Sequence, residues 1–169
     1  MKFKEFKIIE TLQEEQLISE WININNYSAQ LLYRCSKDGD LSKTFHEKCN
    51  GKSPTIVFIK TKDNLKIGGY TTTEWNDRQE FSSDKNAFIF SLTNKKKYFI
   101  KKSNEAIWGG SVNGPIFGTN EIYIRNQCSS EGGENSYPSS YNFNEKGELV
   151  GGKTEFEILE YEVYLIKRQ

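Results

Sequence analysis

A β-hairpin within residues 54–75 constrains the fold of this chain more than any other stretch. Thr55 to Lys60 is an unbroken β-branched and aromatic run, too short for a globular helix and without polar alternation. Such a run predicts a central strand with apolar neighbours on both faces. Lys62 to Asn64 supplies a turn, and Leu65 to Thr73 resumes strand composition. Since glycine is costly inside a strand, Gly68-Gly69 indicates either a bulge or a close approach of another group to the backbone.

Composition and charge narrow the class of protein. A chain of 169 residues fits one domain, and a hydrophobic fraction of 36% with an aromatic fraction of 14% excludes a disordered chain. Lys+Arg and Asp+Glu are equal at 23 each, so no net field draws the chain onto nucleic acid or an anionic membrane. Apolar runs are too short to cross a bilayer, and the opening residues lack the apolar stretch of a signal peptide. We expect a soluble protein without direct membrane insertion.

The cysteines bear on the compartment. Cys35, Cys49 and Cys128 are odd in number and widely spaced, which argues against a secreted disulfide framework. A reducing cytosol is the compartment that best fits these cysteines, so we expect a cytoplasmic protein. We also expect a monomer.

Two helices are predicted before the central hairpin. Thr11 to Glu14 has capping-box spacing, and Leu17, Ile18 and Trp21 then share one face, so residues 12–22 should cover the sheet. A second helix should start near Ser42, with an apolar stripe and a C-terminal glycine at Leu41, Phe45, Cys49 and Gly51.

Short strands and turns account for the rest of the chain up to residue 147. Their signals are β-branched or aromatic runs bounded by glycine, asparagine, aspartate or lysine clusters. In chain order we expect an edge strand at 1–10, a strand at 31–35, a tight turn at 37–40, a polar stretch at 76–84, a strand at 87–92, a lysine-rich hairpin at 95–102, a loop at 109–118 whose Ile116-Phe117 dips into the core, a strand at 122–125, a mobile surface loop at 126–136 and a turn at 144–147.

The final run, Phe156 to Ile166, breaks its own alternation, because its apolar residues switch from even to odd numbers. We predict one inserted residue, a β-bulge, near Ile158-Leu159. Many short strands with few helices favour a mainly β fold with peripheral α: a two-sheet antiparallel β-sandwich flanked by two or more short helices. The solvent-exposed face of its last strand should carry four glutamates, Glu155, Glu157, Glu160 and Glu162.

Catalytic and metal-binding patterns are weak. His46 is the one histidine and lies three residues before Cys49, so the two can face one metal ion on a helix. Cys35 can in principle join them in a zinc site, but no fourth ligand is apparent. Core packing of Cys49 and a hydrogen-bonded, structural His46 is the simpler interpretation. A nucleophilic triad would need the same His46, and no nucleophile-elbow sequence accompanies it. No cofactor is expected.

Nucleotide and nucleic-acid sites are also disfavoured. The sequence GGSVNGPIFG over 109–118 has glycines but lacks the Lys-Ser/Thr of a P-loop and the spacing of a dinucleotide fingerprint. Lysines at 95–97 and 101–102 around Tyr98 and Phe99 can neutralise a single strand, but they also protect an edge hairpin from unwanted pairing. We expect no nucleic-acid partner.

Seven segments in order carry a resemblance. They read LLYRCSKDGD, FHEKCNGKSPTIVFIKT, IGGYTTTEW, DKNAFIFSLTN, NGPIFG, EIYIRNQC and EVYLI. Together they resemble the TLDc domain family of oxidation-resistance proteins, and the match divides the chain into an N-terminal extension or helix at 1–28, packed on the domain, and a TLDc-like β-sandwich at 29–169. The matching single positions are Asp38, Gly39, His46, Gly51, Gly68, Gly69, Trp75, Asp84, Gly114, Pro115 and Gly118.

This resemblance implies a helix-flanked β-sandwich, protection against oxidative damage and, in several members, association with the peripheral sector of the vacuolar proton-pumping ATPase. It brings no established catalytic centre. We therefore expect a non-catalytic protein-interaction domain. Exposed loops on a rigid scaffold are where partners bind, so the candidate contact residues are Gly68, Gly69, Trp75, Gly114, Pro115, Phe117 and Gly118.

Two alternatives remain open. One is a thiol-dependent antioxidant or hydrolytic enzyme that uses His46 and Cys49, or another of the thiols. The other is a ligand-binding sandwich with Trp75, Trp108 and Tyr137 as aromatic platforms.

Overall fold

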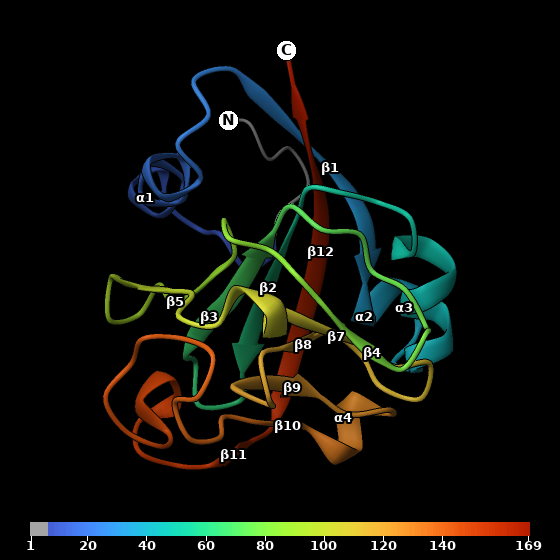
Figure 1. Ribbon diagram of the computed structural model, residues 1–169. Helices are drawn as coiled ribbons and strands as arrows, with labels where there is room; N and C mark the ends of the chain where they lie inside the picture. The colour runs from blue at the N-terminus through green and yellow to red at the C-terminus, as the bar shows by residue number, and fades with distance from the viewer. Residues whose placement is uncertain (1–6) are drawn as a thin grey trace.

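Two six-stranded antiparallel sheets, packed face to face, make up most of the molecule (Figure 1). The computed structural model describes residues 7–169. The first sheet contains, in spatial order, β1 (Tyr27–Arg34), β12 (Ile158–Arg168), β2 (Thr55–Thr61), β3 (Lys66–Thr71), β5 (Phe88–Ser91) and β6 (Lys96–Phe99). The second sheet contains, in spatial order, β11 (Glu155–Phe156), β10 (Gly133–Glu134), β9 (Ile122–Ile124), β8 (Ile116–Phe117), β7 (Ile107–Gly109) and β4 (Glu80–Ser82).

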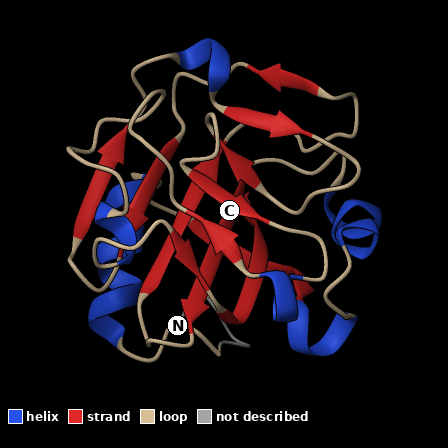
Figure 2. Ribbon diagram, turned by 90° about the horizontal axis from the view of Figure 1, so that it is seen from below, coloured by secondary structure: helices blue, strands red, loops and turns tan. Residues whose placement is uncertain are grey.

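Helices lie around the rim of the two sheets (Figure 2). They are α1 (Leu12–Ile22), α2 (Cys35–Asp38), α3 (Ser42–Cys49) and α4 (Cys128–Glu131), with short 3-10 turns η1 (Ser103–Glu105) and η2 (Glu148–Val150). Within residues 7–169, none of them has both the length and the apolar character that a membrane crossing needs. The predicted mainly β, two-sheet antiparallel sandwich with peripheral helices is confirmed.

The central hairpin forms as predicted from β2 and β3. Its turn places Asn64 at φ 63°, a left-handed conformation that asparagine tolerates. The strands pair without a register shift, Phe58 opposite Gly68 and Val57 opposite Gly69. The glycine pair is therefore not a bulge, and close approach is the correct alternative.

Both faces of β2 are buried because they line different cores. Val57 and Ile59 belong to the cluster between the two sheets. Ile56 and Phe58 point the other way, into a second cluster under α1. β5 repeats this division, with Phe88 and Phe90 in the second cluster. The absence of polar alternation in the sequence thus reflects helices or sheets packed on both sides of these strands.

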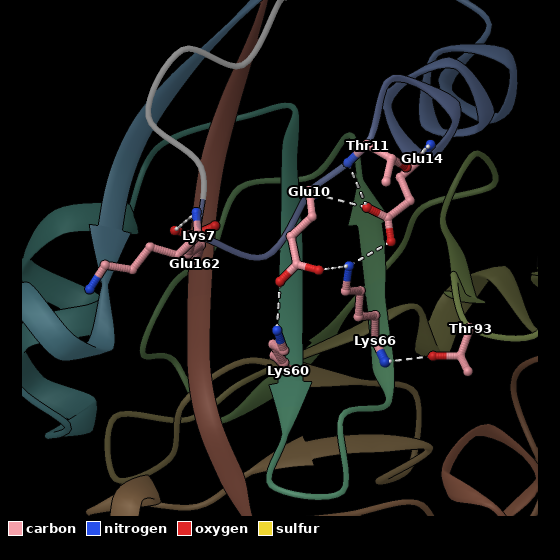
Figure 3. Close-up of polar contacts among 8 residues, drawn as sticks. All are labelled: Lys7, Glu10, Thr11, Glu14, Lys60, Lys66, Thr93 and Glu162. Atoms are coloured by element: carbon pink, nitrogen blue, oxygen red, sulfur yellow. Dashed lines mark hydrogen bonds and ion pairs between the residues drawn. The ribbon is translucent and has the colours of Figure 1, made fainter.

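Helix α1 covers the first sheet and begins with the predicted capping box. The Thr11 hydroxyl accepts from the Glu14 amide, and the Glu14 carboxylate accepts from the Thr11 amide. Glu10 bridges Lys60 and Lys66 of the underlying strands at 2.6 and 3.0 Å, and Lys66 also reaches Glu14 at 2.6 Å (Figure 3). An ionic network therefore holds the leading segment on the sheet.

The edge strand predicted at 1–10 is not present in its described part, because residues 7–10 form no strand; residues 1–6 lie outside the described residues. Ile8 and Ile9 are nevertheless buried in the cluster under α1. Their lack of a clean period fits an irregular segment that packs by individual side chains.

The region around α3 differs from the prediction in two places. The segment predicted as a tight turn begins as one helical turn, α2, which ends at Gly39 with φ 95°. Phe45 and Cys49 are fully buried as predicted, but Leu41 is 44% exposed because it caps the helix instead of continuing its stripe.

β12 carries the predicted bulge. Its register against β2 shifts between Ile158 and Glu160, which leaves Leu159 on the surface, 56% exposed. The predicted solvent-exposed face is wrong for two of its glutamates, because other segments cover them: Glu162 accepts from the Lys7 amide at 3.2 Å and Glu160 from the Ser36 amide at 3.1 Å, and both are buried. Arg34 on β1 binds Glu162 at 2.6 Å.

The segment predicted as a mobile surface loop at 126–136 contains regular secondary structure and is partly internal. It contains α4 and β10, and both Cys128 and Asn135 are fully buried. The polar stretch at 76–84 likewise contains a strand, β4, which pairs with β7. Strands of two or three residues form through partners elsewhere in the chain, so local composition misses them.

The lysines lie in a hairpin, but its position differs from the predicted 95–102, because β5 pairs with β6 and Lys96 and Lys97 belong to the strand β6 at the edge of the first sheet. Lys97 lies 4.2 Å above the Phe88 ring and donates to the Trp21 carbonyl at 2.7 Å. The lysines thus protect the exposed edge and also fasten it to the end of α1.

Candidate functional site

His46 on α3 fastens the loop between β7 and β8. Its Nε2 lies 2.9 Å from the carbonyl oxygens of both Gly110 and Asn113, so this nitrogen donates to the loop backbone. Its Nδ1 lies 2.8 Å from the Asn50 side-chain oxygen. Both ring nitrogens are occupied, as the structural interpretation of this histidine predicted.

This arrangement leaves little room for chemistry at His46 and Cys49. A general base or metal ligand needs a free ring nitrogen, and a nucleophilic thiol needs access to substrate. Cys49 is fully buried, and its burial raises the pKa of the thiol well above the ordinary range. Among the described residues, no group of three or more His, Cys, Asp or Glu side chains is placed to hold a metal ion.

Gly68 and Gly69 are positions of close backbone approach on opposite faces of β3. A Cβ on Gly68 would lie 2.0 Å from the Val57 carbonyl oxygen, and one on Gly69 would lie 2.5 Å from the Phe117 ring. Phe117 is fully buried, and Trp75, 1% exposed, packs edge-on against it at 5.5 Å. The expectation that these residues lie on the partner-facing surface is wrong, because Gly69, Phe117 and Trp75 pack between the two sheets, whereas Gly68 packs against Phe90 in the cluster under α1.

The loop glycines and proline at 114–118 are buried as well. The Gly114 amide donates to the Ile124 carbonyl at 2.9 Å, and the Pro115 carbonyl accepts from the Ile124 amide at 3.1 Å. Gly118 has φ 65° and lies against the Glu121 carboxylate, where any Cβ would collide with it. These residues shape the loop and its return into β8, so their side of the loop is not free to meet a partner.

Two buried carboxylates hold the surrounding turns. Glu121 is fully buried and accepts hydrogen bonds from the backbone amides of Thr119, Ser139, Ser140 and Tyr141. Asp84, 5% exposed, accepts from the hydroxyls of Thr71 and Thr72, each at 2.8 Å. The hydrogen bonds that these carboxylates accept come from the turns around them, so both carboxylates stabilise those turns.

The other family-type positions also have local structural roles. Asp38 accepts from the Arg34 amide and pairs with Lys48 at 2.9 Å. Gly39 and Gly51 hold positive φ angles of 95° and 70° at the ends of α2 and α3.

The outward face of the second sheet carries a row of large apolar side chains, which we call the outer row: Phe81, Trp108, Ile116 and Tyr123. They stand directly opposite one another on β4, β7, β8 and β9, so they share one face of the sheet. The opposite face holds Ile107 within the core. Phe81 is 40% exposed and meets the Trp108 ring edge-on at 4.8 Å.

A shallow pocket of about 200 Å³ opens on this row. The Tyr123 hydroxyl closes one side by donating to the Asn113 side-chain oxygen at 2.8 Å. Val112, at the tip of the loop held by His46, is 70% exposed. The predicted loop is thus next to an accessible apolar surface, although the predicted residues support that surface from behind.

Sequence reasoning missed Phe81 and Tyr123. Phe81 stands alone in a polar stretch, and the alternation on β9 spans only Ile122 to Ile124. The sequence does contain a signal for this face. Three short strands each carry two adjacent large apolar residues, one for each face of the sheet: Ile107-Trp108, Ile116-Phe117 and Ile122-Tyr123.

The predicted aromatic platform does not form. Trp75 is buried in the sandwich, whereas Trp108 belongs to the outer row. Tyr137 is 69% exposed and stands under Lys146, 5.0 Å from its ring centroid.

Comparison with known proteins gives the family. The family model of the TLDc domain matches residues 3–167, nearly the whole chain. The chain belongs to the TLDc domain family. Members of this family are linked to protection against oxidative stress, and the family is generally non-catalytic. No curated protein matches the chain. Because the TLDc match begins at residue 3, it includes α1 and the ionic network that holds it.

Proposed function

We propose that this TLDc domain is a non-catalytic protein-interaction module of the oxidative-stress response that binds the peripheral sector of the vacuolar proton-pumping ATPase. A monomer in the cytoplasm would meet that sector directly. The single observation that carries the proposal is the outer row, an accessible aromatic face beside a loop fixed by His46.

Several properties suit this face to protein binding. Aromatic residues, tryptophan and tyrosine above all, are enriched at the centres of protein interfaces. Phe81 and Val112 present apolar area at the surface, 40% and 70% exposed, while Trp108 and Tyr123 are only partly exposed and held by their neighbours. A preorganised surface loses little conformational freedom on binding, which favours affinity.

The hydrolytic alternative at His46 and Cys49 receives no comparable support. Both nitrogens of the imidazole are already hydrogen-bonded, and the thiol has no exposed surface. A substrate would have to displace the loop that the histidine holds.

A pull-down with quantitative mass spectrometry tests the proposed partner. Wild-type protein should recover peripheral ATPase subunits from a lysate of the source cell, and the Phe81→Ser/Val112→Ser variant should recover less than about a tenth as much. Phe99→Ser is the matched control, because Phe99 is 60% exposed but lies on β6 of the first sheet. Recovery of none by folded wild type, or equal recovery by all proteins, would reject this partner or this surface.

A further inference from the structure

Two cysteines that are 93 residues apart in the sequence meet where α2 and α4 lie against the first sheet. The Sγ atoms of Cys35 and Cys128 are 3.5 Å apart. They lie beside Tyr33 of β1 and Tyr161 of β12, whose ring centroids are 4.7 Å apart. A disulfide needs about 2.05 Å between its sulfurs, so only modest side-chain movement separates this pair from a bond.

Hydrogen bonds fix the relative position of the two cysteines. The Cys128 amide donates to the Asp40 carbonyl at 3.3 Å, and the Ser129 hydroxyl donates to the Asp40 carboxylate. The turn that follows Cys35 is therefore tied to the start of α4, so the two thiols are held together by the surrounding fold.

We propose that Cys35 and Cys128 are a redox-active thiol pair, which hydrogen peroxide converts into an intramolecular disulfide. This site lies beyond the proposed partner-binding function, and it does not depend on it, because its readout is thiol oxidation instead of binding.

The two thiols differ in the way that such a pair requires. Cys35 is partly exposed, whereas Cys128 is fully buried. The hydrogen bond from the Cys128 thiol lowers the pKa of Cys35, against the opposing effects of burial and of the Glu160 and Asp40 carboxylates; the Tyr33 hydroxyl assists. The same thiol–thiol contact raises the pKa of Cys128. Cys35 is thus the attacking thiolate and Cys128 the thiol that resolves.

The reaction balances with peroxide as the two-electron oxidant. The Cys35 thiolate attacks one peroxide oxygen, the O–O bond breaks, and the departing hydroxide takes a proton to leave as water, which gives a sulfenic acid on Cys35. The Cys128 sulfur then attacks that sulfur, its proton passes to the departing hydroxide, and a second water leaves as the S–S bond forms. A dithiol reverses the step by thiol–disulfide exchange.

Cys49 provides an internal control, because it is fully buried and its burial raises the pKa of its thiol. Folded protein is treated with one equivalent of hydrogen peroxide, alkylated, digested without reductant and mapped by mass spectrometry. We expect a linked Cys35–Cys128 peptide in wild type and in Cys49→Ala, with the mass of two hydrogen atoms lost and restored by dithiothreitol. Neither Cys35→Ser nor Cys128→Ala should yield it.

A second readout on wild type does not depend on a crosslink. The pH at which Cys35 alkylates at half its maximal rate should fall below its ordinary value of 9.0 and should rise in Cys128→Ala, whose folding is verified by thermal melting. Oxidised wild type that keeps both thiols free, carries a higher oxide on Cys35, or links through Cys49 or between molecules would overturn the proposal.

Discussion

Replacing Gly69 by alanine tests the role assigned to the glycine pair. The added Cβ would lie 2.5 Å from one carbon of the Phe117 ring and 2.7 Å from two others. The ring cannot swing aside, because Trp75 and Tyr141 pack against it at 5.5 and 6.5 Å. Overpacking of this kind costs about 1–3 kcal/mol, and a loss near 2 kcal/mol lowers the melting temperature by about 4–8 °C in a chain of this size.

A double-mutant cycle identifies the ring as the cause. Phe117→Leu alone should lose about 1–2 kcal/mol through lost burial and a small cavity. The Gly69→Ala methyl then occupies part of that cavity, so the double variant should be more stable than the sum of the single losses by about 1 kcal/mol. Free energies of unfolding from urea titration, with the slope compared across variants, give these values.

Gly68→Ala is the contrasting control. Its Cβ would lie 2.0 Å from the Val57 carbonyl oxygen, a backbone atom of the central strand, as well as 2.5 Å from the Phe90 ring. Truncating Phe90 should therefore not rescue it. The packing role would be refuted if Gly69→Ala were as stable as wild type, or if the stability losses of Gly69→Ala and Phe117→Leu were strictly additive. Gly68 and Gly69 would then again be candidates for a partner-binding surface.

Two further predictions concern His46 and the ionic network on α1. His46→Ala leaves the Gly110 carbonyl without its donor, which costs about 1–3 kcal/mol. The variant should show faster hydrogen exchange in the 110–114 loop, measured by mass spectrometry. Unchanged exchange would show that the histidine does not hold the loop. Hydrogen bonds from Lys60 and Lys66 lower the pKa of Glu10 in the folded protein below its ordinary value of 4.5. These bonds therefore stabilise the fold fully above pH 4.5, and that stabilisation is lost as the pH falls through the lower folded pKa. The melting temperature should fall on acidification from about pH 5 to pH 3, and Lys66→Met should make that fall shallower; an identical pH profile in the variant would contradict it.

Elements with strong local signals were predictable from the sequence. A capping box and an apolar face indicate the helix after Thr11, and an unbroken β-branched run indicates the central strand. The change of parity in the last strand located the bulge near Ile158 because a period of two leaves no other way to keep both sets of side chains inside.

Features that depend on distant partners were not predictable. Glu162 looks like a solvent-facing residue until Arg34, 128 positions away, supplies its charge partner. The two-residue strand β10 forms only because β9 and β11 flank it.

The candidate site likewise combines features that the local sequence indicates with features that depend on distant partners. The sequence indicated the 109–118 loop, but its glycines and Phe117 carry the packing behind the surface. Side chains that face solvent on two-residue and three-residue strands have no period to reveal them, so Phe81 and Tyr123 required the register. The meeting of Cys35 with Cys128 likewise depends on the docking of two helical turns that neither sequence segment predicts.

Titration of this protein with the purified peripheral sector of the vacuolar ATPase measures the proposed interaction most directly. We expect saturable binding by wild type and by Phe99→Ser. Phe81→Ser/Val112→Ser should bind at least about tenfold more weakly, a loss of about 1.4 kcal/mol, at a temperature where thermal melting shows every variant to be folded. Absence of binding by folded wild type, or equal affinity of all three proteins, would contradict a partner surface on the outer row.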